Sequence, residues 1–81
     1  MLEVKVYSKD HCPLCDKGVA VLKELQQEIP FEFTVIDIYQ DDDLLEQYQL
    51  MIPVVSINGE DIDFGQFSKG KIRNRLHQFN Q

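Results

Sequence analysis

The sequence predicts an α/β domain with the element order βαβαββα, in which a four-stranded mixed sheet is flanked by three helices. Two patterns support this fold class. Short β-branched runs alternate with stretches whose apolar residues recur at helical spacing, which is typical of strand–helix–strand units. Asn58-Gly59 separates two later runs as a tight hairpin turn does. Because 81 residues leave room for one core, residues 1–81 are predicted to form a single domain.

The first half of the chain has the pattern of a strand, a helix and a second strand. Alternating apolar and polar residues favour a strand over about residues 3–8. From Pro13 onward, apolar residues at steps of three and four predict a helix to about residue 29, where Pro30 ends it. Residues 31–37 are rich in Phe, Val, Ile and Thr, which favours a strand. A crossover of this kind pairs its two strands in parallel.

The second half of the chain predicts a helix, a hairpin and a final helix. The acidic run at residues 41–43 supplies cap and first-turn residues for a short helix. Pro53 is expected at the entrance of the third strand, because proline cannot donate to a central ladder. Asn58-Gly59 then leads into an antiparallel strand around residues 61–63. The last helix is expected from near residue 65 to about residue 79.

The composition limits the kinds of partner. A formal charge of −6 disfavours nucleic acids and anionic membranes. No apolar run approaches the roughly 20 residues that span a bilayer, and the start of the chain lacks a signal-peptide pattern, so a cytoplasmic protein is expected. A monomer is also expected. Half of the basic residues lie in one C-terminal stretch and are expected to complement the end of the last helix, with docking of an acidic partner as the alternative. They are Lys69, Lys71, Arg73 and Arg75.

Both cysteines lie at the predicted start of the first helix. Cys12 and Cys15 are three residues apart, so they are neighbours on one helix face and can form a disulfide. The helix N-terminus and Lys9 favour a thiolate at Cys12, whereas Asp10 and Asp16 oppose it. We therefore predict that Cys12 is the nucleophile and that the less exposed Cys15 is the resolving thiol.

Two other interpretations compete with a redox role for the cysteine pair. Buried cysteines can act as small hydrophobes, but Cys12 is expected to be exposed at its loop-to-helix junction. A strand leading into C-x-x-C at a helix start is also the local layout of soft-metal chaperones, which hold copper between two thiolates. A closed zinc site would need two more ligands, for which only His11 and His77 are candidates beyond the carboxylates. The redox interpretation is favoured, and no metal is expected.

Four features together resemble the glutaredoxin family, whose fold is thioredoxin-like. They are Lys9, the C-P-L-C motif, Ile52-Pro53 ahead of a strand, and Gly65 at the last strand-to-helix junction. The resemblance covers nearly the whole chain. It implies a thiol–disulfide oxidoreductase in which Cys12 is the nucleophile and Lys9 contacts glutathione. It also implies a cis Ile52-Pro53 bond, with the backbone of Ile52 hydrogen-bonded to the substrate.

Two departures from the family pattern bear on glutathione. The usual tyrosine of the motif is replaced by Leu14. The family's double glycine, small residue and aspartate, which hold the γ-glutamyl end of glutathione, are replaced by Phe64-Gly65-Gln66-Phe67. The amides of Gln66 and Phe67 are expected at the helix start, where they can bind a carboxylate, but the partner of the α-amino group is missing. The sequence therefore predicts a protein or small-molecule disulfide as substrate, weak or no glutathione use, and no cofactor beyond a Cys12–Cys15 disulfide. The reductant is either glutathione or a reductase.

Overall fold

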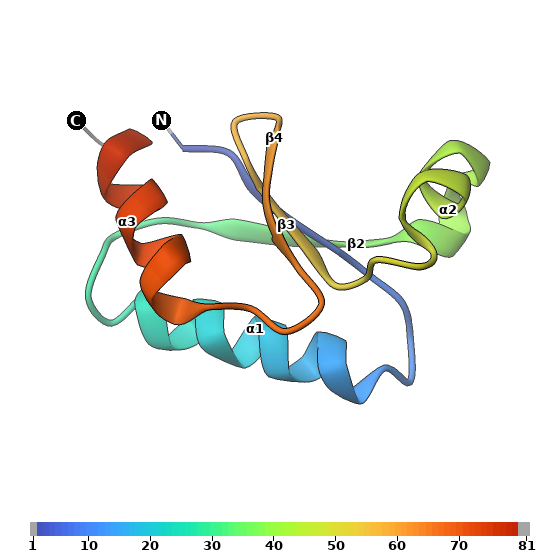
Figure 1. Cartoon of the computed structure of the whole chain (residues 1–81), viewed down its shortest axis with the longest axis horizontal. Helices are drawn as coiled ribbons and strands as arrows, with labels where there is room; N and C mark the ends of the chain where they lie inside the picture. Colours follow the sequence, from blue (N-terminus) through green and yellow to red (C-terminus); the bar gives the residue numbers. More distant parts are fainter. Residues whose placement is uncertain (1, 80–81) are drawn as a thin grey trace.

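The computed structural model describes residues 2–79, and the elements follow the predicted order with one short 3-10 helix added (Figure 1). None of the helices in this range has the length and apolar character needed to cross a bilayer. The elements are β1 (Val4–Ser8), α1 (Pro13–Leu25), β2 (Phe33–Asp37), η1 (Ile38–Gln40), α2 (Asp42–Tyr48), β3 (Val54–Ile57), β4 (Glu60–Phe64) and α3 (Lys69–Phe79).

The four strands form one mixed sheet in the order β2-β1-β3-β4. β1 is parallel to β2, as the crossover predicts, and β3 is antiparallel to both β1 and β4. Asn58 and Gly59 make the tight turn between β3 and β4, with φ values of 51° and 86°. Asparagine and glycine adopt this left-handed conformation most readily. The Asn58 amide also donates to the carbonyl of Glu3 at 2.8 Å, which ties the hairpin to the start of β1.

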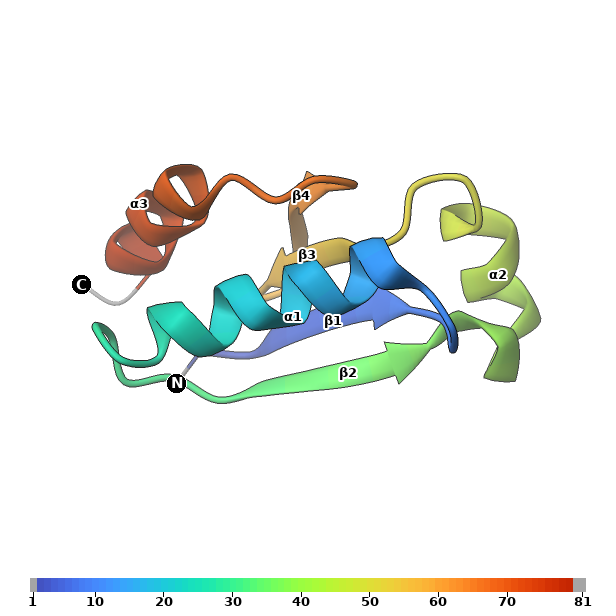
Figure 2. The same ribbon diagram turned by 90° about the horizontal axis from the view of Figure 1, so that it is seen from below.

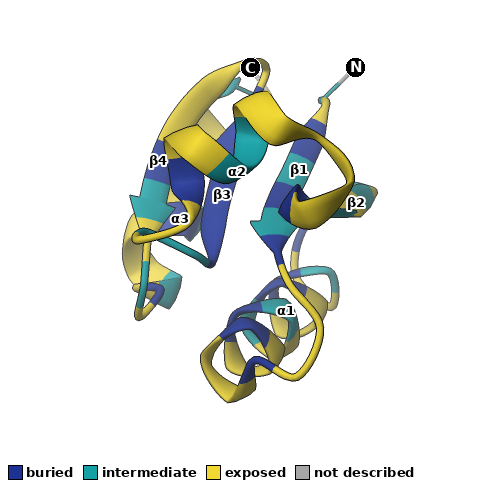
Figure 3. Cartoon of the chain, turned by 90° about the vertical axis from the view of Figure 1, so that its right-hand side faces the viewer, coloured by how far each residue is buried: buried dark blue, intermediate teal, exposed yellow. Residues whose placement is uncertain are grey.

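α1 lies across one face of the sheet, with α3 beside it and α2 at one end of the strands (Figure 2). α1 and α3 cover one face and bury the main core between them and the sheet (Figure 3). α2 covers one end of the opposite face, where Tyr48 stacks on Tyr7 with ring centroids 4.5 Å apart. The buried members of the main core are Val4, Val6, Leu22, Leu25, Ile29, Val55, Ile57, Ile62, Phe67, Ile72 and Leu76.

α1 is shorter than the apolar pattern predicts. It ends at Leu25, and the chain continues through a hydrogen-bonded turn to Ile29, which stays buried. In this turn the amides of Gln27 and Glu28 donate to carbonyls three residues back, and this tighter winding ends the α-helix. Pro30 disfavours a helical conformation in the residue before it. The helix was thus predicted, but its end was placed about four residues too late.

α3 begins at Lys69, four residues later than expected. The hydroxyl of Ser68 accepts a hydrogen bond from the amide of Lys71 at 3.2 Å, as an N-cap side chain does. The Ser68 amide itself donates to the carboxylate of Asp63 at 2.8 Å. Gly65 has a φ of 68°, which no helix residue has. Gln66 and Phe67 therefore lie in the loop before the helix.

The basic C-terminal stretch does not complement the end of α3 as predicted. Lys69 and Lys71 lie in its first turn, and all four cations have acidic partners on other elements, so the stretch joins α3 to the α1 region and to β4. The ion pairs are Lys69 with Glu24 and Glu28, Lys71 with Asp63, Arg73 with Glu28, and Arg75 with Glu60.

Candidate active site

The cysteine pair lies where the loop after β1 enters α1. Cys12 is the N-cap residue, with an extended backbone, and its Sγ accepts a hydrogen bond from the amide of Cys15 at 3.2 Å. Pro13 occupies the first turn, where its missing N–H has no intrahelical partner to lose. The two sulfurs form a disulfide that joins Cα atoms 5.2 Å apart.

The expectation that Cys12 is exposed is wrong. The exposed fraction is 9% for Cys12 and 2% for Cys15, so Cys15 is the less accessible of two buried residues. Cys12 is covered because its sulfur turns back over the first helical turn to meet the amide and sulfur of Cys15. Burial alone therefore does not distinguish this pair from buried free cysteines, whereas the disulfide does.

The Ile52-Pro53 peptide bond is cis, as the family resemblance implies. The ring of Pro53 is buried against α1, with its Cγ 3.3 Å from the position that a Cβ on Gly18 would occupy. Gly18 is one helical turn beyond Cys15, so the proline loop lies beside the helix face that carries the resolving thiol.

The backbone of Ile52 differs from what the resemblance implies. Its amide donates to the carbonyl of Tyr48 at 3.1 Å, at the end of α2, so it is not free to bind a substrate. Its carbonyl receives no backbone hydrogen bond from the part of the chain between residues 2 and 79. One of the two expected backbone contacts is thus available.

The loop between β4 and α3 is tied to the proline loop. The amide of Gly65 donates to the carbonyl of Pro53 at 2.8 Å and to that of Met51 at 3.2 Å. Phe67 is buried in the main core, and a Cβ on Gly18 would lie 2.8 Å from its ring. Because α3 begins only at Lys69, the amides of Gln66 and Phe67 are not at a helix start, which corrects the predicted carboxylate site.

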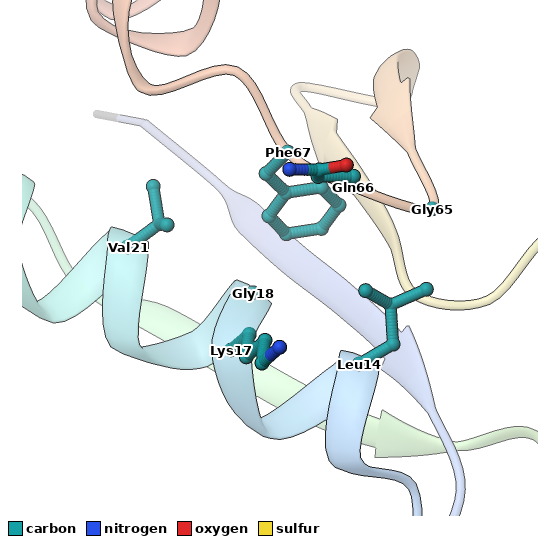
Figure 4. A pocket seen from close by; sticks show the side chains of 7 residues that line it. All are labelled: Leu14, Lys17, Gly18, Val21, Gly65, Gln66 and Phe67. Carbon is teal, nitrogen blue, oxygen red and sulfur yellow. The ribbon is translucent and has the colours of Figure 1, made fainter.

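A groove of about 330 Å³ opens between α1 and this loop (Figure 4). Gly65 and Gln66 were predicted as binding residues and do line it, whereas Lys9 lies exposed in the β1–α1 loop outside it. The groove residues on α1 were not predicted, although residues spaced by three and four share a helix face. The full lining is Leu14, Lys17, Gly18, Val21, Gly65, Gln66 and Phe67.

The two histidines do not join the cysteine pair. His11 is exposed in the loop before α1, with a φ of 55°, and His77 is exposed near the end of α3. Among residues 2–79, no three His, Cys, Asp or Glu side chains gather closely enough to hold a metal ion.

Comparison with known proteins assigns the family. A family model described as a glutaredoxin-like domain matches residues 3–77. The chain belongs to the glutaredoxin-like domain family. The resemblance in sequence is therefore confirmed, and it extends across almost the entire chain.

Solved structures similar to this glutaredoxin-like domain agree on the fold. Protein XcR50 from X. campestris is 26% identical, with a TM-score of 0.79 and coverage of 93% of this chain and 96% of that one. Protein Ne2328 from Nitrosomonas europaea is 25% identical, with a TM-score of 0.83 and coverage of 91% and 89%. A thioredoxin from Halobacterium salinarum is 15% identical, with a TM-score of 0.73 and coverage of 99% and 75%. The predicted thioredoxin-like fold is confirmed. Membership of the glutaredoxin-like domain family, together with the Cys12–Cys15 disulfide, indicates a thiol redox function.

Proposed function

We propose that this glutaredoxin-like protein is a thiol–disulfide oxidoreductase that reduces protein disulfides as a cytoplasmic monomer, with weak or no use of glutathione. The observation that supports the proposal most is the placement of Cys12 and Cys15. Their sulfurs are bonded across the first turn of α1, and the Cys15 amide points at the sulfur of Cys12. In the reduced protein this amide and the helix N-terminus favour a thiolate at Cys12.

The proposed reaction is two successive thiol–disulfide exchanges. The Cys12 thiolate attacks one sulfur of the substrate disulfide, which forms a mixed disulfide and releases the other substrate sulfur as a thiolate. The Cys15 sulfur, after losing its proton to solvent or to the released thiolate, attacks the Cys12 sulfur. The second substrate sulfur then leaves as a thiolate. The substrate gains two electrons, Cys12 and Cys15 become a disulfide, and a dithiol or glutathione reduces them again.

Substrate binding in this proposal uses the proline loop. An extended polypeptide beside Pro53 donates a backbone hydrogen bond to the Ile52 carbonyl, as in strand addition. The amide of Ile52 keeps its bond to Tyr48, so the substrate makes one backbone hydrogen bond at this residue. Lys9, exposed in the loop before the cysteines, attracts an anionic group of the substrate.

Weak glutathione use follows from the loop before α3. Phe67 is a core residue, and the exposed position next to it is Gln66, which has no charge to pair with the γ-glutamyl ammonium. Loss of one charge-assisted hydrogen bond lowers affinity by about 10- to 100-fold. Phe64, which is 58% exposed, adds a bulky ring where the family has glycine.

The test of the proposed function uses insulin as the protein disulfide and dithiothreitol as the reductant. Wild-type protein is expected to accelerate insulin reduction, and Cys12→Ser to abolish the acceleration. Cys15→Ser is expected to accumulate a mixed disulfide that mass spectrometry detects. No acceleration by the wild type over dithiothreitol alone would contradict the proposal. Stoichiometric Cu(I) binding without any disulfide reduction would instead support the metal-binding alternative.

Glutathione use is tested by coupling the same preparation to glutathione and glutathione reductase. Turnover of a small disulfide is expected to be at least about tenfold lower than with dithiothreitol at equal thiol concentration. Gln66→Asp introduces a carboxylate on the exposed side of the loop. It is expected to raise the glutathione-coupled rate and to leave the rate with dithiothreitol unchanged. Gln78→Asp on α3 is the control and is expected to change neither rate. Equal rates with both reductants in the wild type would show that glutathione is a good substrate.

A further inference from the structure

The groove beside the cysteine pair carries a positive charge that forms no ion pair with residues 2–79. Five of the eight Lys and Arg residues form ion pairs, whereas Lys9, Lys17 and Lys23 form none with residues 2–79. Lys17 is the one of these three that lines the groove. Glu24, two turns further along α1, is engaged by Lys69 at 3.1 Å.

The rest of the groove is mostly apolar. The side chains of Leu14 and Val21 and the ring of Phe67 line it, with Lys17 on α1 and the amide of Gln66 across from it on the loop (Figure 4). Leu14 is 39% exposed although it is apolar, so covering it would remove apolar surface from water. A volume of about 330 Å³ is near the lower limit for ligand sites and suits a short peptide segment.

We propose that this groove binds the polypeptide segment next to the disulfide of a protein substrate, and that it selects an apolar side chain with an acidic one beside it. This inference rests on the proposed function and deepens it. The apolar side chain packs against Phe67 and Leu14, and the carboxylate pairs with the Lys17 ammonium. Leu14 lines the groove and lies between the two cysteines in sequence, so one end of the groove is next to the cysteine pair.

The net charge of −6 opposes an acidic substrate, but it comes from charges spread over the molecule, whereas Lys17 would contact the carboxylate directly. At about 0.15 M salt the Debye length is roughly 8 Å, so distant charges are largely screened while a contact pair is not. An exposed ion pair of this kind changes binding by about two- to fivefold. The selectivity for an acidic residue is therefore expected to be of that size at physiological salt.

The test uses three disulfide-linked peptides that share one apolar residue and differ beside it, with Glu, Gln or Lys. For wild-type protein at about 0.15 M salt, kcat/KM is expected to fall in the order Glu, Gln, Lys, by about two- to fivefold per step. Lys17→Glu is expected to reverse the order. Lys23→Glu is the matched control, because Lys23 is also exposed and unpaired on α1 among residues 2–79 but lies outside the groove. Replacing the apolar residue of the peptide by Ser is expected to lower kcat/KM in every case.

The outcomes separate this inference from the proposed function. Equal kcat/KM values for the three peptides would overturn selection by the groove, and so would an equal change in peptide preference in Lys17→Glu and Lys23→Glu. Insulin reduction by the wild type would still support the proposed function in either case. Reduction of insulin without reduction of any peptide would also overturn it. Failure with both insulin and the peptides would overturn the proposed function, and the groove inference with it.

Discussion

At the level of single residues, the hydrogen bond from the Cys15 amide makes the two thiols unequal. It reaches the sulfur of Cys12, whereas Cys15 lies inside the helix and is almost fully buried. In the reduced protein at neutral pH, Cys12 is expected to react with iodoacetamide about tenfold faster than Cys15. Peptide mapping by mass spectrometry after brief alkylation measures the ratio. Faster alkylation of Cys15 would reverse the roles assigned to the two residues.

Gly18 is required where α1 meets both site loops. A Cβ at this position would lie 2.8 Å from the ring of Phe67 and 3.3 Å from the ring of Pro53. Gly18→Ala is therefore expected to lose about 1–3 kcal/mol from overpacking, against a gain of about 1 kcal/mol in helix propensity, and to slow disulfide reduction. Gly70→Ala in α3 is the control, because a Cβ there meets nothing within 4 Å, and it is expected to raise stability. Urea unfolding of both variants checks the prediction, which fails if Gly18→Ala is as stable as Gly70→Ala.

At the level of elements, Tyr48 holds the end of α2 against the sheet. Its hydroxyl donates to the carboxylate of Asp61 at 3.1 Å, and burial, followed by the charge of Asp61, raises the pKa of Tyr48 to about 12 from 10.0. Because the folded-state pKa is the higher one, the neutral phenol stabilises the fold fully below pH 10.0, and this contribution is lost as the pH rises toward about 12. The urea midpoint of the wild type is expected to fall over that pH range, and that of Tyr48→Phe is expected to fall less. Tyr39→Phe is the control, because Tyr39 is 59% exposed, and it should behave as the wild type. A fall in Tyr48→Phe equal to that of the wild type would contradict the role assigned to Tyr48.

The elements differ in how far the sequence determined them. β1, α1 and the β3–β4 hairpin were predicted because strand alternation, helical spacing and the Asn58-Gly59 turn are local signals. The start of α3 was misplaced because Phe67 was included in the apolar pattern of the helix, while the cap at Ser68 depends on Asp63 and on the path of the loop. The burial of Phe67 also depends on Gly18, which is distant in sequence and has no side chain to signal the contact.

At the level of the whole molecule, three separate segments form the candidate site: the start of α1 with the cysteine pair, the proline loop, and the loop between β4 and α3. The cysteine pair and the cis proline were expected from a motif and a family resemblance, since both are short patterns of residues. The groove was not, because Lys17 and Val21 look like ordinary surface and boundary residues of α1 until the β4–α3 loop lies across from them. Likewise, the engagement of the Ile52 amide by Tyr48 follows from how α2 ends, which no local pattern indicates.

The α1 region and α3, from opposite halves of the chain, are joined by an ion-pair cluster centred on Glu28. Arg73 donates to both of its oxygens, at 2.9 and 3.0 Å, and Lys69 lies 3.7 Å away. The hydrogen bond from Arg73, with the charges of Arg73 and Lys69, holds the pKa of Glu28 below its usual 4.5. Because the folded-state pKa is the lower one, the stabilisation is present above pH 4.5 and is lost as the pH falls through the folded-state value.

Glu28→Gln is accordingly expected to lower the urea midpoint slightly at pH 7 and low salt, because exposed ion pairs contribute little. The difference from the wild type should shrink in about 1 M salt, where screening is strong, and should disappear on acidification well below pH 4.5, where the wild-type carboxyl is also neutral. Glu32→Gln is the matched control, since Glu32 is exposed and forms no ion pair with residues 2–79. If the urea midpoint of Glu28→Gln stayed below that of the wild type by the same amount at every pH and salt concentration, the Glu28 side chain would stabilise the fold by packing. The ion pairs with Arg73 and Lys69 would then not hold the α1 region and α3 together.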